Sequence, residues 1–310
     1  MKIIMMGSGG VGGFFGGHLA RIGCDVSFVA RGRHLEALKA NGLTLENKTL
    51  GNVHIPNVKA TDDPASLGVA DIVILSVKLW DTEDAARAIR PLVGPHTGVL
   101  SLQNGVVKDD ILRRVFDPGQ VMGGVCYVAT HIARPGVIEQ TGAMQRIIVG
   151  EYDKRVSDRV RELHQALQKT GVTAELSDDV RRAIWEKYVF LVGLSATTTT
   201  MRSTIGPIRT NARSRSFLHD VMREVVAVGR ALGVALPEDY ADQRLAFADT
   251  VPATMTSSMH HDLERGNRLE VEWLSGGVVE MGRKAGVPTP CNRIVWDLLD
   301  LYSNGKREAA

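Results

Sequence analysis

The sequence lacks any hydrophobic run long enough to cross a membrane. Across its 310 residues, no apolar stretch approaches the roughly 20 residues that a transmembrane helix requires. The short apolar segment before Gly7 is also too brief for the core of a signal peptide. We therefore expect a cytoplasmic protein with no membrane partner.

Cysteine is scarce, and neither cysteine nor histidine is arranged as in a metal site. The three cysteines Cys24, Cys126 and Cys291 are odd in number and widely separated, which argues against a disulfide framework and suits a reducing compartment. His260 and His261 are neighbours, but adjacent residues on a helix point in different directions. We expect buried thiols and no bound metal.

A strong excess of charge is also lacking. The chain has 37 basic and 35 acidic residues, a net charge of +2 that falls short of the basic signature of nucleic-acid-binding proteins. Its hydrophobic content of 44% and charged content of 23% are ordinary for a globular protein. Because 310 residues exceed what one core usually sustains, we expect two domains and no nucleic-acid partner.

Glycine is abundant in one place, directly after the apolar segment 3–6. Seven glycines lie between Gly7 and Gly17, and Gly7, Gly9 and Gly12 fit the pattern G-x-G-x-x-G. In that pattern the first glycine allows a tight turn, the second lets backbone approach a pyrophosphate, and the third lets the helix pack on the strand. The helix expected at 12–21 would direct its positive N-terminal dipole at the phosphates. A flexible turn without ligand is the alternative. The loop residues expected to hold a dinucleotide are Gly7, Ser8, Gly9, Gly10, Val11 and Gly12.

The expected second strand, residues 26–30, is not followed by an acidic residue. Enzymes that prefer NAD carry Asp or Glu there to accept from the ribose 2′-hydroxyl, but this chain has Arg31. A guanidinium matches a phosphate with a planar fork of donors, whereas a carboxylate would repel it. The sequence therefore predicts NADPH/NADP+ over NAD(H), against the alternative that Arg31 is a solvated loop residue.

Strands and helices alternate in the first part of the chain, which predicts a doubly wound α/β sheet. The expected strands of this part are residues 3–6, 26–30, 43–45, 53–55, 72–77 and 99–102. The expected helices are 12–21, a helix that contains Leu35 and Leu38, 82–90 and 108–115. Short strands are expected at 127–132, 136–140 and 146–149, separated by turns at Pro135-Gly136 and Thr141-Gly142. A helix at 157–170 and a strand at 172–176 would complete residues 1–177 as the dinucleotide-binding domain.

Strand signals nearly vanish beyond the helix-capping cluster Ser177-Asp178-Asp179. The expected helices there are 180–194, 214–232, 237–250, a region from 258 to 285, and 292–302. We therefore expect residues 178–310 to form an all-helical substrate and catalytic domain. The predicted fold is a Rossmann-type sheet followed by a helical bundle.

Two polar residues follow strands of the predicted sheet, where open α/β sheets bind their ligands. Lys78 follows strand 72–77 and would complement a cofactor phosphate, unless it is an ordinary surface lysine. Asn104 follows strand 99–102 and begins an Asn-Gly pair, which is also a common turn. Its place in the predicted cleft favours a functional role.

Lys187 begins an otherwise wholly apolar stretch of helix, 187–194, where a lysine is costly unless it is paired. One alternative is that its head extends to water. The functional interpretation places the ammonium in the interdomain cleft as proton donor to a carbonyl that is being reduced, since a free lysine has a pKa of about 10.4. Its carboxylate partner would be one of Glu264, Glu270 and Glu272.

Several of these segments together resemble the ketopantoate reductases, or 2-dehydropantoate 2-reductases. The resemblance rests on the segments 7–13, 29–32, 76–78, 102–106, 185–187 and 257–270. It implies NADPH-dependent reduction of a 2-oxo acid and a helical domain similar to that of 6-phosphogluconate dehydrogenase-like proteins. The implied roles are Lys187 as general acid, Glu270 and Ser258 on the substrate, Asn104 between nicotinamide and substrate, and Arg31 and Lys78 around the 2′-phosphate. By analogy, the helical domain is compatible with a homodimer.

The chain departs from this family one and two helical turns after Lys187. Ketopantoate reductases typically have asparagines there, whereas this chain has Leu191 and Ser195 on the same helix face as the lysine. Each lost hydrogen bond can be worth about 0.5–1.5 kcal/mol. We expect Leu191 and Ser195 to contact a substrate that is either ketopantoate or a more apolar 2-oxo or 3-hydroxy acid. A third alternative is an NADP-binding sensor without turnover.

Overall fold

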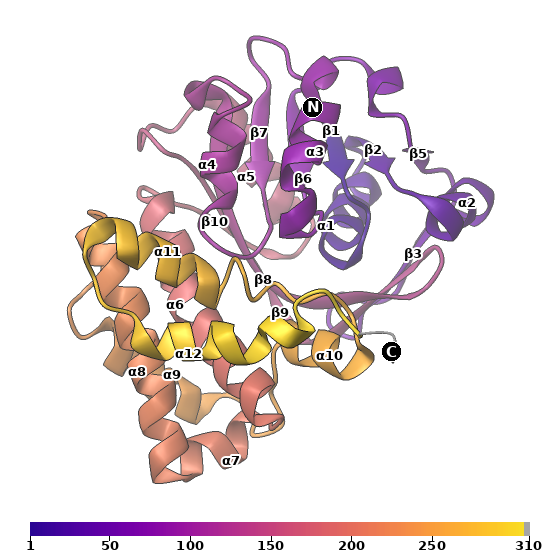
Figure 1. The fold of residues 1–310 in the computed structure, drawn as a ribbon. Helices are drawn as coiled ribbons and strands as arrows, with labels where there is room; N and C mark the ends of the chain where they lie inside the picture. The colour runs from indigo at the N-terminus through magenta and orange to yellow at the C-terminus, as the bar shows by residue number, and fades with distance from the viewer. Residues whose placement is uncertain (307–310) are drawn as a thin grey trace. The chain divides into compact units, whose positions relative to one another are not determined.

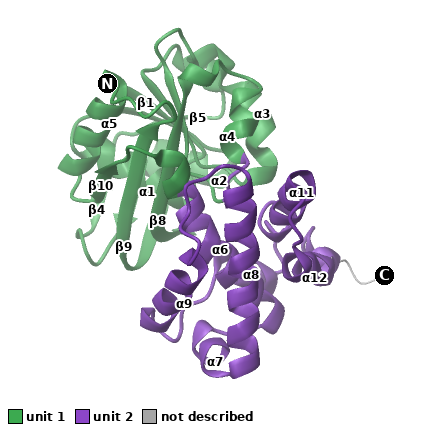
Figure 2. Ribbon diagram, turned by 90° about the vertical axis from the view of Figure 1, so that its left-hand side faces the viewer, with its two compact units in different colours: residues 1–104, 108–183 green, residues 105–107, 184–310 purple. Residues whose placement is uncertain are grey.

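The computed structural model describes residues 1–306 and divides into two compact units, coloured separately in Figure 2. Unit 1 comprises Met1–Asn104 and Lys108–Ala183, and unit 2 comprises Gly105–Val107 and the described residues from Ile184 onward. Unit 1 is a mixed α/β structure and unit 2 is helical. The prediction of a sheet domain followed by a helical domain is confirmed.

Unit 1 is built on one sheet, which has ten strands within the described residues. The strand order is β4-β3-β9-β8-β7-β6-β1-β2-β5, and β10 pairs with β9. The strands are β1 (Lys2–Met6), β2 (Asp25–Val29), β3 (Leu43–Glu46), β4 (Val53–Ile55), β5 (Lys59–Thr61), β6 (Ile72–Leu75), β7 (Gly98–Ser101), β8 (Val121–Arg134), β9 (Val137–Glu151) and β10 (Thr173–Leu176). Strand β1 pairs in parallel with β2 on one side and β6 on the other, so these three strands end at the same edge of the sheet.

Helices cover both faces of this sheet, because its central strands are apolar on both faces (Figure 1). Ile3 and Met5 pack with α1 (Gly10–Arg21), α2 (Gly32–Asn41) and α5 (Asp158–Lys169). Ile4 and Met6 face the other way and pack with α3 (Thr82–Ala88) and α4 (Lys108–Arg113). Short 3-10 turns lie at η1 (Pro64–Leu67), η2 (Leu79–Asp81), η3 (Arg90–Leu92) and η4 (Pro118–Gln120). The doubly wound arrangement is therefore as predicted.

The short strands expected at 127–132, 136–140 and 146–149 are instead parts of one long antiparallel hairpin formed by β8 and β9. The predicted turn at Pro135-Gly136 exists, and Gly136 adopts a φ of +80°. At Thr141-Gly142 strand β9 continues, but its pairing with β8 is interrupted, and Gly142 adopts a φ of +81°. The register passes from Val128 with Gln145 to Thr130 with Gln140, so residues 141–144 bulge out opposite Ala129 before the two strands pair again.

Unit 2 is built around α6, whose buried residues include Tyr188, Val189 and Val192. The helices are α6 (Val180–Met201), α7 (Ile205–Thr210), α8 (Ala212–Ala231), α9 (Tyr240–Thr250), α10 (Ser258–Arg265), α11 (Ser275–Ala285) and α12 (Pro290–Leu299), followed by η5 (Asp300–Tyr302). The region expected to be helical from 258 to 285 is interrupted, since Gly266 adopts a left-handed conformation with a φ of +68° and ends α10. Sequence patterns did not indicate the short helix α7.

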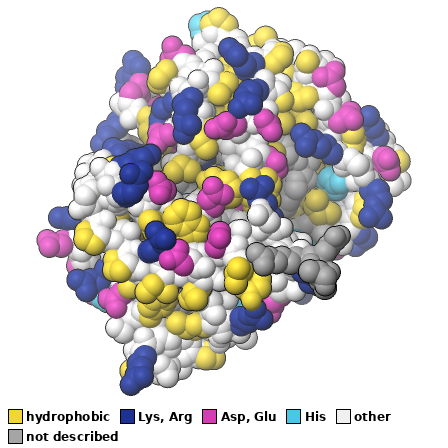
Figure 3. Space-filling model, in the orientation of Figure 1, with side chains coloured by type: hydrophobic (Ala, Val, Ile, Leu, Met, Phe, Trp, Pro, Cys, Tyr) yellow, Lys and Arg dark blue, Asp and Glu magenta, His cyan; other side chains and the backbone are white. Residues whose placement is uncertain are grey.

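The described residues were also searched for membrane spans and metal sites. None of the helices in residues 1–306 is long and apolar enough to cross a membrane. The same residues contain no group of three His, Cys, Asp or Glu side chains that could hold a metal ion. Among the described residues the three cysteines form no disulfide, and of the three thiols expected to be buried only Cys126 is fully buried. On the face drawn in Figure 3, basic and acidic side chains are interspersed.

Candidate functional site

The glycine loop connects the end of β1 to the start of α1. Gly7 adopts a φ of +96°, and a Cβ there would lie 2.8 Å from the Val77 side chain. Its amide donates to the carbonyl of Val29 at 3.3 Å, and its carbonyl accepts from the Ser76 hydroxyl at 2.6 Å. Gly7 therefore makes the tight turn that only glycine allows without strain.

The other glycines of the motif differ in what they face. A Cβ on Gly12 would lie 2.0 Å from the carbonyl oxygen of Gly7, and one on Gly10 would lie 2.4 Å from the carbonyl oxygen of Thr130. Close packing against backbone therefore requires glycine at both positions. The space beside Gly9 is open, since its Cβ would meet nothing within 4 Å.

This open space lies at the N-terminus of α1, which fits an anionic ligand. Gly9 is the N-cap of α1 and provides no side-chain cap for the first amides of the helix. Such amides, together with the helix dipole, form an anion site. The glycine loop therefore fits the pyrophosphate of a dinucleotide by an observation independent of the sequence motif.

Two other residues of the loop have side chains that turn into unit 1. Ser8 is buried, and its hydroxyl donates to the carbonyl of Val29 at 3.0 Å. Val11 is partly buried and packs against the core that α1 shares with the sheet. These two residues can offer a ligand their backbone more readily than their side chains.

Arg31 and Lys78 follow the two strands that flank β1. Arg31 is the exposed N-cap of α2, directly after β2. Lys78 is the N-cap of η2 after β6, and its ammonium lies 5.5 Å from the centre of the Trp80 ring. Since β2 and β6 run parallel to β1, both residues belong to the edge of the sheet at which the glycine loop begins.

Asn104 follows β7 and is half-buried at the last position of unit 1 before Gly105–Val107. Sequence reasoning missed the importance of its neighbour Gln103. The buried Gln103 amide nitrogen donates to the Thr82 hydroxyl at 2.8 Å and to the Lys78 carbonyl at 3.2 Å. Gln103 thus ties the loop that carries Asn104 to the loop that carries Lys78.

A buried ion pair fixes the other end of the Asn104 loop. The ammonium of Lys108 lies 2.9 Å from the carboxylate of Asp109, and each side chain is 1% exposed. Lys108 also donates to the carbonyls of Ser101 at 2.9 Å and Gly124 at 3.2 Å. Tyr152 donates its hydroxyl to Asp109, and burial raises the pKa of this tyrosine. No sequence pattern indicated this pair, because adjacent charges at a helix start usually face water.

In unit 2, α6 places Lys187, Leu191 and Ser195 on one face at intervals of one helical turn. Lys187 is half-buried, and Leu191 packs at the edge of the unit 2 core. Ser195 is 1% exposed, and its hydroxyl has no hydrogen-bond partner among the described residues. The face therefore carries a cation, an apolar side chain and an unsatisfied hydroxyl in succession.

The turn that begins at Glu270 is anchored to α6 beside Lys187. The hydroxyl of Tyr188 donates to the carbonyls of Trp273 at 2.9 Å and Leu274 at 2.7 Å. The amide of Leu274 in turn donates to the carbonyl of Glu270 at 3.0 Å. Glu270 is buried, unlike the other candidate carboxylates Glu264 and Glu272, which are exposed.

The N-terminus of α10 is fastened to the far end of α6. The hydroxyl of Ser257 accepts from the amide of His260 at 3.1 Å and lies 3.0 Å from the hydroxyl of Thr198. His260 Nδ1 lies 2.7 Å from the carbonyl of Thr198, an acceptor, so the ring donates there. Ser258 follows the cap and is exposed. Ser257 is thus the structural cap, and Ser258 is the serine free to face a ligand.

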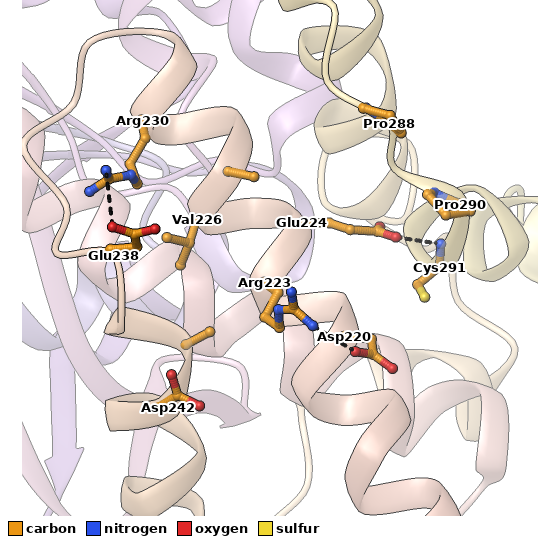
Figure 4. Close-up of a pocket in the computed structure, with 12 residues that line it drawn as sticks. Asp220, Arg223, Glu224, Val226, Arg230, Glu238, Asp242, Pro288, Pro290 and Cys291 are labelled. Atoms are coloured by element: carbon orange, nitrogen blue, oxygen red, sulfur yellow. Dashed lines mark hydrogen bonds and ion pairs between the residues drawn. The ribbon is translucent and has the colours of Figure 1, made fainter.

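A groove of about 520 Å³ on unit 2 lies apart from all these residues (Figure 4). It is lined by α8, the start of α9 and the start of α12, and several of its charges are already paired. Glu224 accepts from the amides of Cys291 at 2.7 Å and Asn292 at 2.9 Å. Burial and the nearby Glu224 raise the pKa of the Cys291 thiol to about 12, so this thiol is unreactive.

Comparison with known proteins covers both units. A family model described as "Ketopantoate reductase PanE/ApbA" matches residues 3–154, and its C-terminal counterpart matches residues 179–303. A 2-dehydropantoate 2-reductase of Mesorhizobium japonicum is 35% identical over 94% of both chains. The crystal structure of a PanE/ApbA family ketopantoate reductase from Ralstonia eutropha is 36% identical, with a TM-score of 0.88 over 98% of both chains. A 2-dehydropantoate 2-reductase structure from Geobacter metallireducens is 31% identical, with a TM-score of 0.90 over 97% of this chain and 99% of the other.

Proposed function

The chain belongs to the ketopantoate reductase family, and we propose that it uses NADPH to reduce a 2-oxo acid, 2-dehydropantoate or a related compound, to the 2-hydroxy acid. The observation that carries the proposal is the open space at Gly9 beside the uncapped first amides of α1. The packing of the protein itself does not require glycine at position 9. The close approach of a ligand's phosphates would explain why glycine stands there.

The residues around the glycine loop favour NADPH over NADH. Arg31 and Lys78 offer two cations at the edge where β2 and β6 end, and neither position holds a carboxylate that would bind a ribose 2′-hydroxyl. We assign both residues to the 2′-phosphate. When bound, the cofactor supplies the hydride that reaches the keto carbon of the substrate.

The residues of unit 2 would handle the substrate and the proton. Lys187 polarises the keto oxygen and donates a proton to it as the alkoxide develops. Glu270 and Ser258 hold the substrate, and Ser258 stands at the N-terminus of α10, where a substrate carboxylate is favoured. From unit 1, Asn104 would contribute its amide beside the reacting carbon. In this assignment the anchored Tyr188 keeps Lys187 and the Glu270 turn in a fixed relation.

A spectrophotometric screen of 2-oxo acids with NADPH and NADH in parallel tests the proposal. We expect oxidation of NADPH with at least one 2-oxo acid and a much lower kcat/KM with NADH. Tight NADPH binding without turnover of any 2-oxo acid would contradict the enzymatic role and favour an NADP-binding sensor.

Exchanging Arg31 for aspartate should weaken the preference for NADPH over NADH. The Arg31→Asp variant loses charge-assisted hydrogen bonds worth about 1.5–3 kcal/mol and gains a repulsion toward phosphate. We expect the ratio of kcat/KM for NADPH to that for NADH to fall at least about tenfold, measured at constant ionic strength. Arg33→Asp makes the same charge change two residues further along α2 and is the control. If the ratio of kcat/KM values were unchanged in Arg31→Asp, or fell equally in both variants, Arg31 would have no specific role in binding the 2′-phosphate.

A second candidate substrate is a more apolar 2-oxo acid or a 3-hydroxy acid. It is favoured by Leu191, which presents an apolar side chain one turn after Lys187 where the family typically has an asparagine amide. In the screen, ketopantoate would then turn over far more slowly than a 2-oxo acid with a hydrocarbon side chain. A clear preference for ketopantoate would exclude this candidate.

A further inference from the structure

His34, in the first turn of α2, lies between two backbone groups from distant parts of unit 1. Its Nε2 is 2.9 Å from the carbonyl oxygen of Ser8, in the middle of the glycine loop. Its Nδ1 is 3.1 Å from the amide nitrogen of Gly136, at the turn between β8 and β9. This side chain is half-buried, and the proposed reaction gives it no role.

The two partners determine the protonation of the ring. A backbone amide can only donate, so Nδ1 must be an unprotonated acceptor toward Gly136. A carbonyl can only accept, so Nε2 must carry the hydrogen that it donates to Ser8. The neutral Nε2–H tautomer satisfies both contacts. Consistently, burial holds the pKa of His34 below its ordinary value.

The ring therefore links the glycine loop to the β8–β9 hairpin, which also supports the start of α1 directly. The Cα of Gly10 packs so closely on the backbone of Thr130 that a Cβ would come within 2.4 Å of its carbonyl oxygen. On its other side, the loop is held to β2 through the Ser8 hydroxyl and the Gly7 amide, both of which donate to Val29. The hydrogen bond from His34 holds the carbonyl of Ser8.

We propose that His34 is a positioning residue for cofactor binding. By holding the Ser8 carbonyl toward α2, it orients the peptide unit that joins Ser8 to Gly9 and keeps the Gly9 amide on the open side of the loop, where a pyrophosphate binds. The inference rests on the proposed function, since it presumes a dinucleotide at this loop. His34 does not touch the reacting atoms, so its loss affects cofactor affinity rather than the chemical step.

Two amide variants separate the contacts that His34 makes. In His34→Gln the side-chain amide nitrogen takes the place of Nε2 and can donate to Ser8, whereas in His34→Asn the side-chain oxygen takes the place of Nδ1 and can only serve Gly136. We expect the Kd for NADPH to rise about threefold to tenfold in His34→Asn, the loss of one positioning hydrogen bond. His34→Gln should stay within about twofold of the wild type. At saturating NADPH, kcat should be unchanged in both variants.

His164→Asn is the matched control, because His164 on α5 also donates through Nε2 to a backbone carbonyl, that of Ala174 at 3.1 Å. We expect it to leave the Kd for NADPH unchanged. A Kd in His34→Asn equal to that of the wild type, or a His34→Gln variant that binds as weakly as His34→Asn, would overturn the inference. Failure of the wild type itself to bind NADPH would instead refute the proposed function, so the two failures are distinct.

Discussion

Replacing Lys187 with alanine should lower kcat at least about 100-fold, the low end of what a general acid contributes. The variant loses both the positive charge that polarises the substrate carbonyl and the proton that neutralises the developing alkoxide. A 100-fold loss corresponds to about 2.7 kcal/mol of transition-state stabilisation. Initial rates of NADPH oxidation at saturating substrate measure the effect. The Kd for NADPH should not change, because the proposed contact of Lys187 is with the substrate oxygen and not with the phosphates of the cofactor.

Two further variants test whether the loss of kcat comes from the missing proton donor. Lys284 is exposed on α11, so Lys284→Ala removes a lysine from the same unit and should retain full activity. Lys187→Arg keeps the charge but cannot give up its proton, since a guanidinium stays protonated at any physiological pH. We expect Lys187→Arg to remain slow. A fully active Lys187→Ala would exclude the general-acid role, and a fully active Lys187→Arg would reduce that role to electrostatic polarisation.

The fold could be predicted because its signals are local. The continuous β-branched run of β6 indicated a strand that is buried on both faces, and the apolar pattern of α6 indicated a buried helix. The β8–β9 hairpin was predicted only in fragments. Its register depends on which residues of two long strands face each other, which local patterns do not show, and a turn-like pair such as Thr141-Gly142 can also lie within a bulged strand.

The same distinction applies to the site. The glycine motif and Arg31 could be interpreted from the sequence because they match a local pattern, a strand, a glycine turn and a helix, with the residue after the next strand. Gln103 and His34 could not, because each contacts groups that are distant in sequence and that only the folded chain brings near. His18 is a residue whose burial the sequence did not indicate. Burial lowers its pKa to about 4, although nothing in the sequence of α1 distinguishes it from a solvated histidine at a helix end.

Replacing Lys108 with methionine should destabilise unit 1 by about 3–5 kcal/mol, the usual effect of breaking a buried ion pair from one side. Methionine fills the space of the lysine stem, but it leaves the carboxylate of Asp109 almost wholly buried without its cation. The carbonyls of Ser101 and Gly124 lose a donor at the same time. Urea unfolding followed by circular dichroism, with NADPH binding as the reporter of unit 1, measures the loss.

The expected loss of stability arises because the ion pair is buried, and two controls test this explanation. Arg87→Met removes the cation of the exposed pair with Glu83 on α3, where both side chains are more than half exposed, and should cost at most about 1 kcal/mol. Adding Asp109→Asn to Lys108→Met removes the stranded charge yet leaves an acceptor for the Tyr152 hydroxyl. The double variant should therefore be more stable than Lys108→Met alone, as expected when an uncompensated buried charge is the main penalty. The double variant could instead prove equally or less stable than Lys108→Met. In that case Lys108 would stabilise the loop of Asn104 through its packing and its two backbone contacts, and not by neutralising the charge of Asp109.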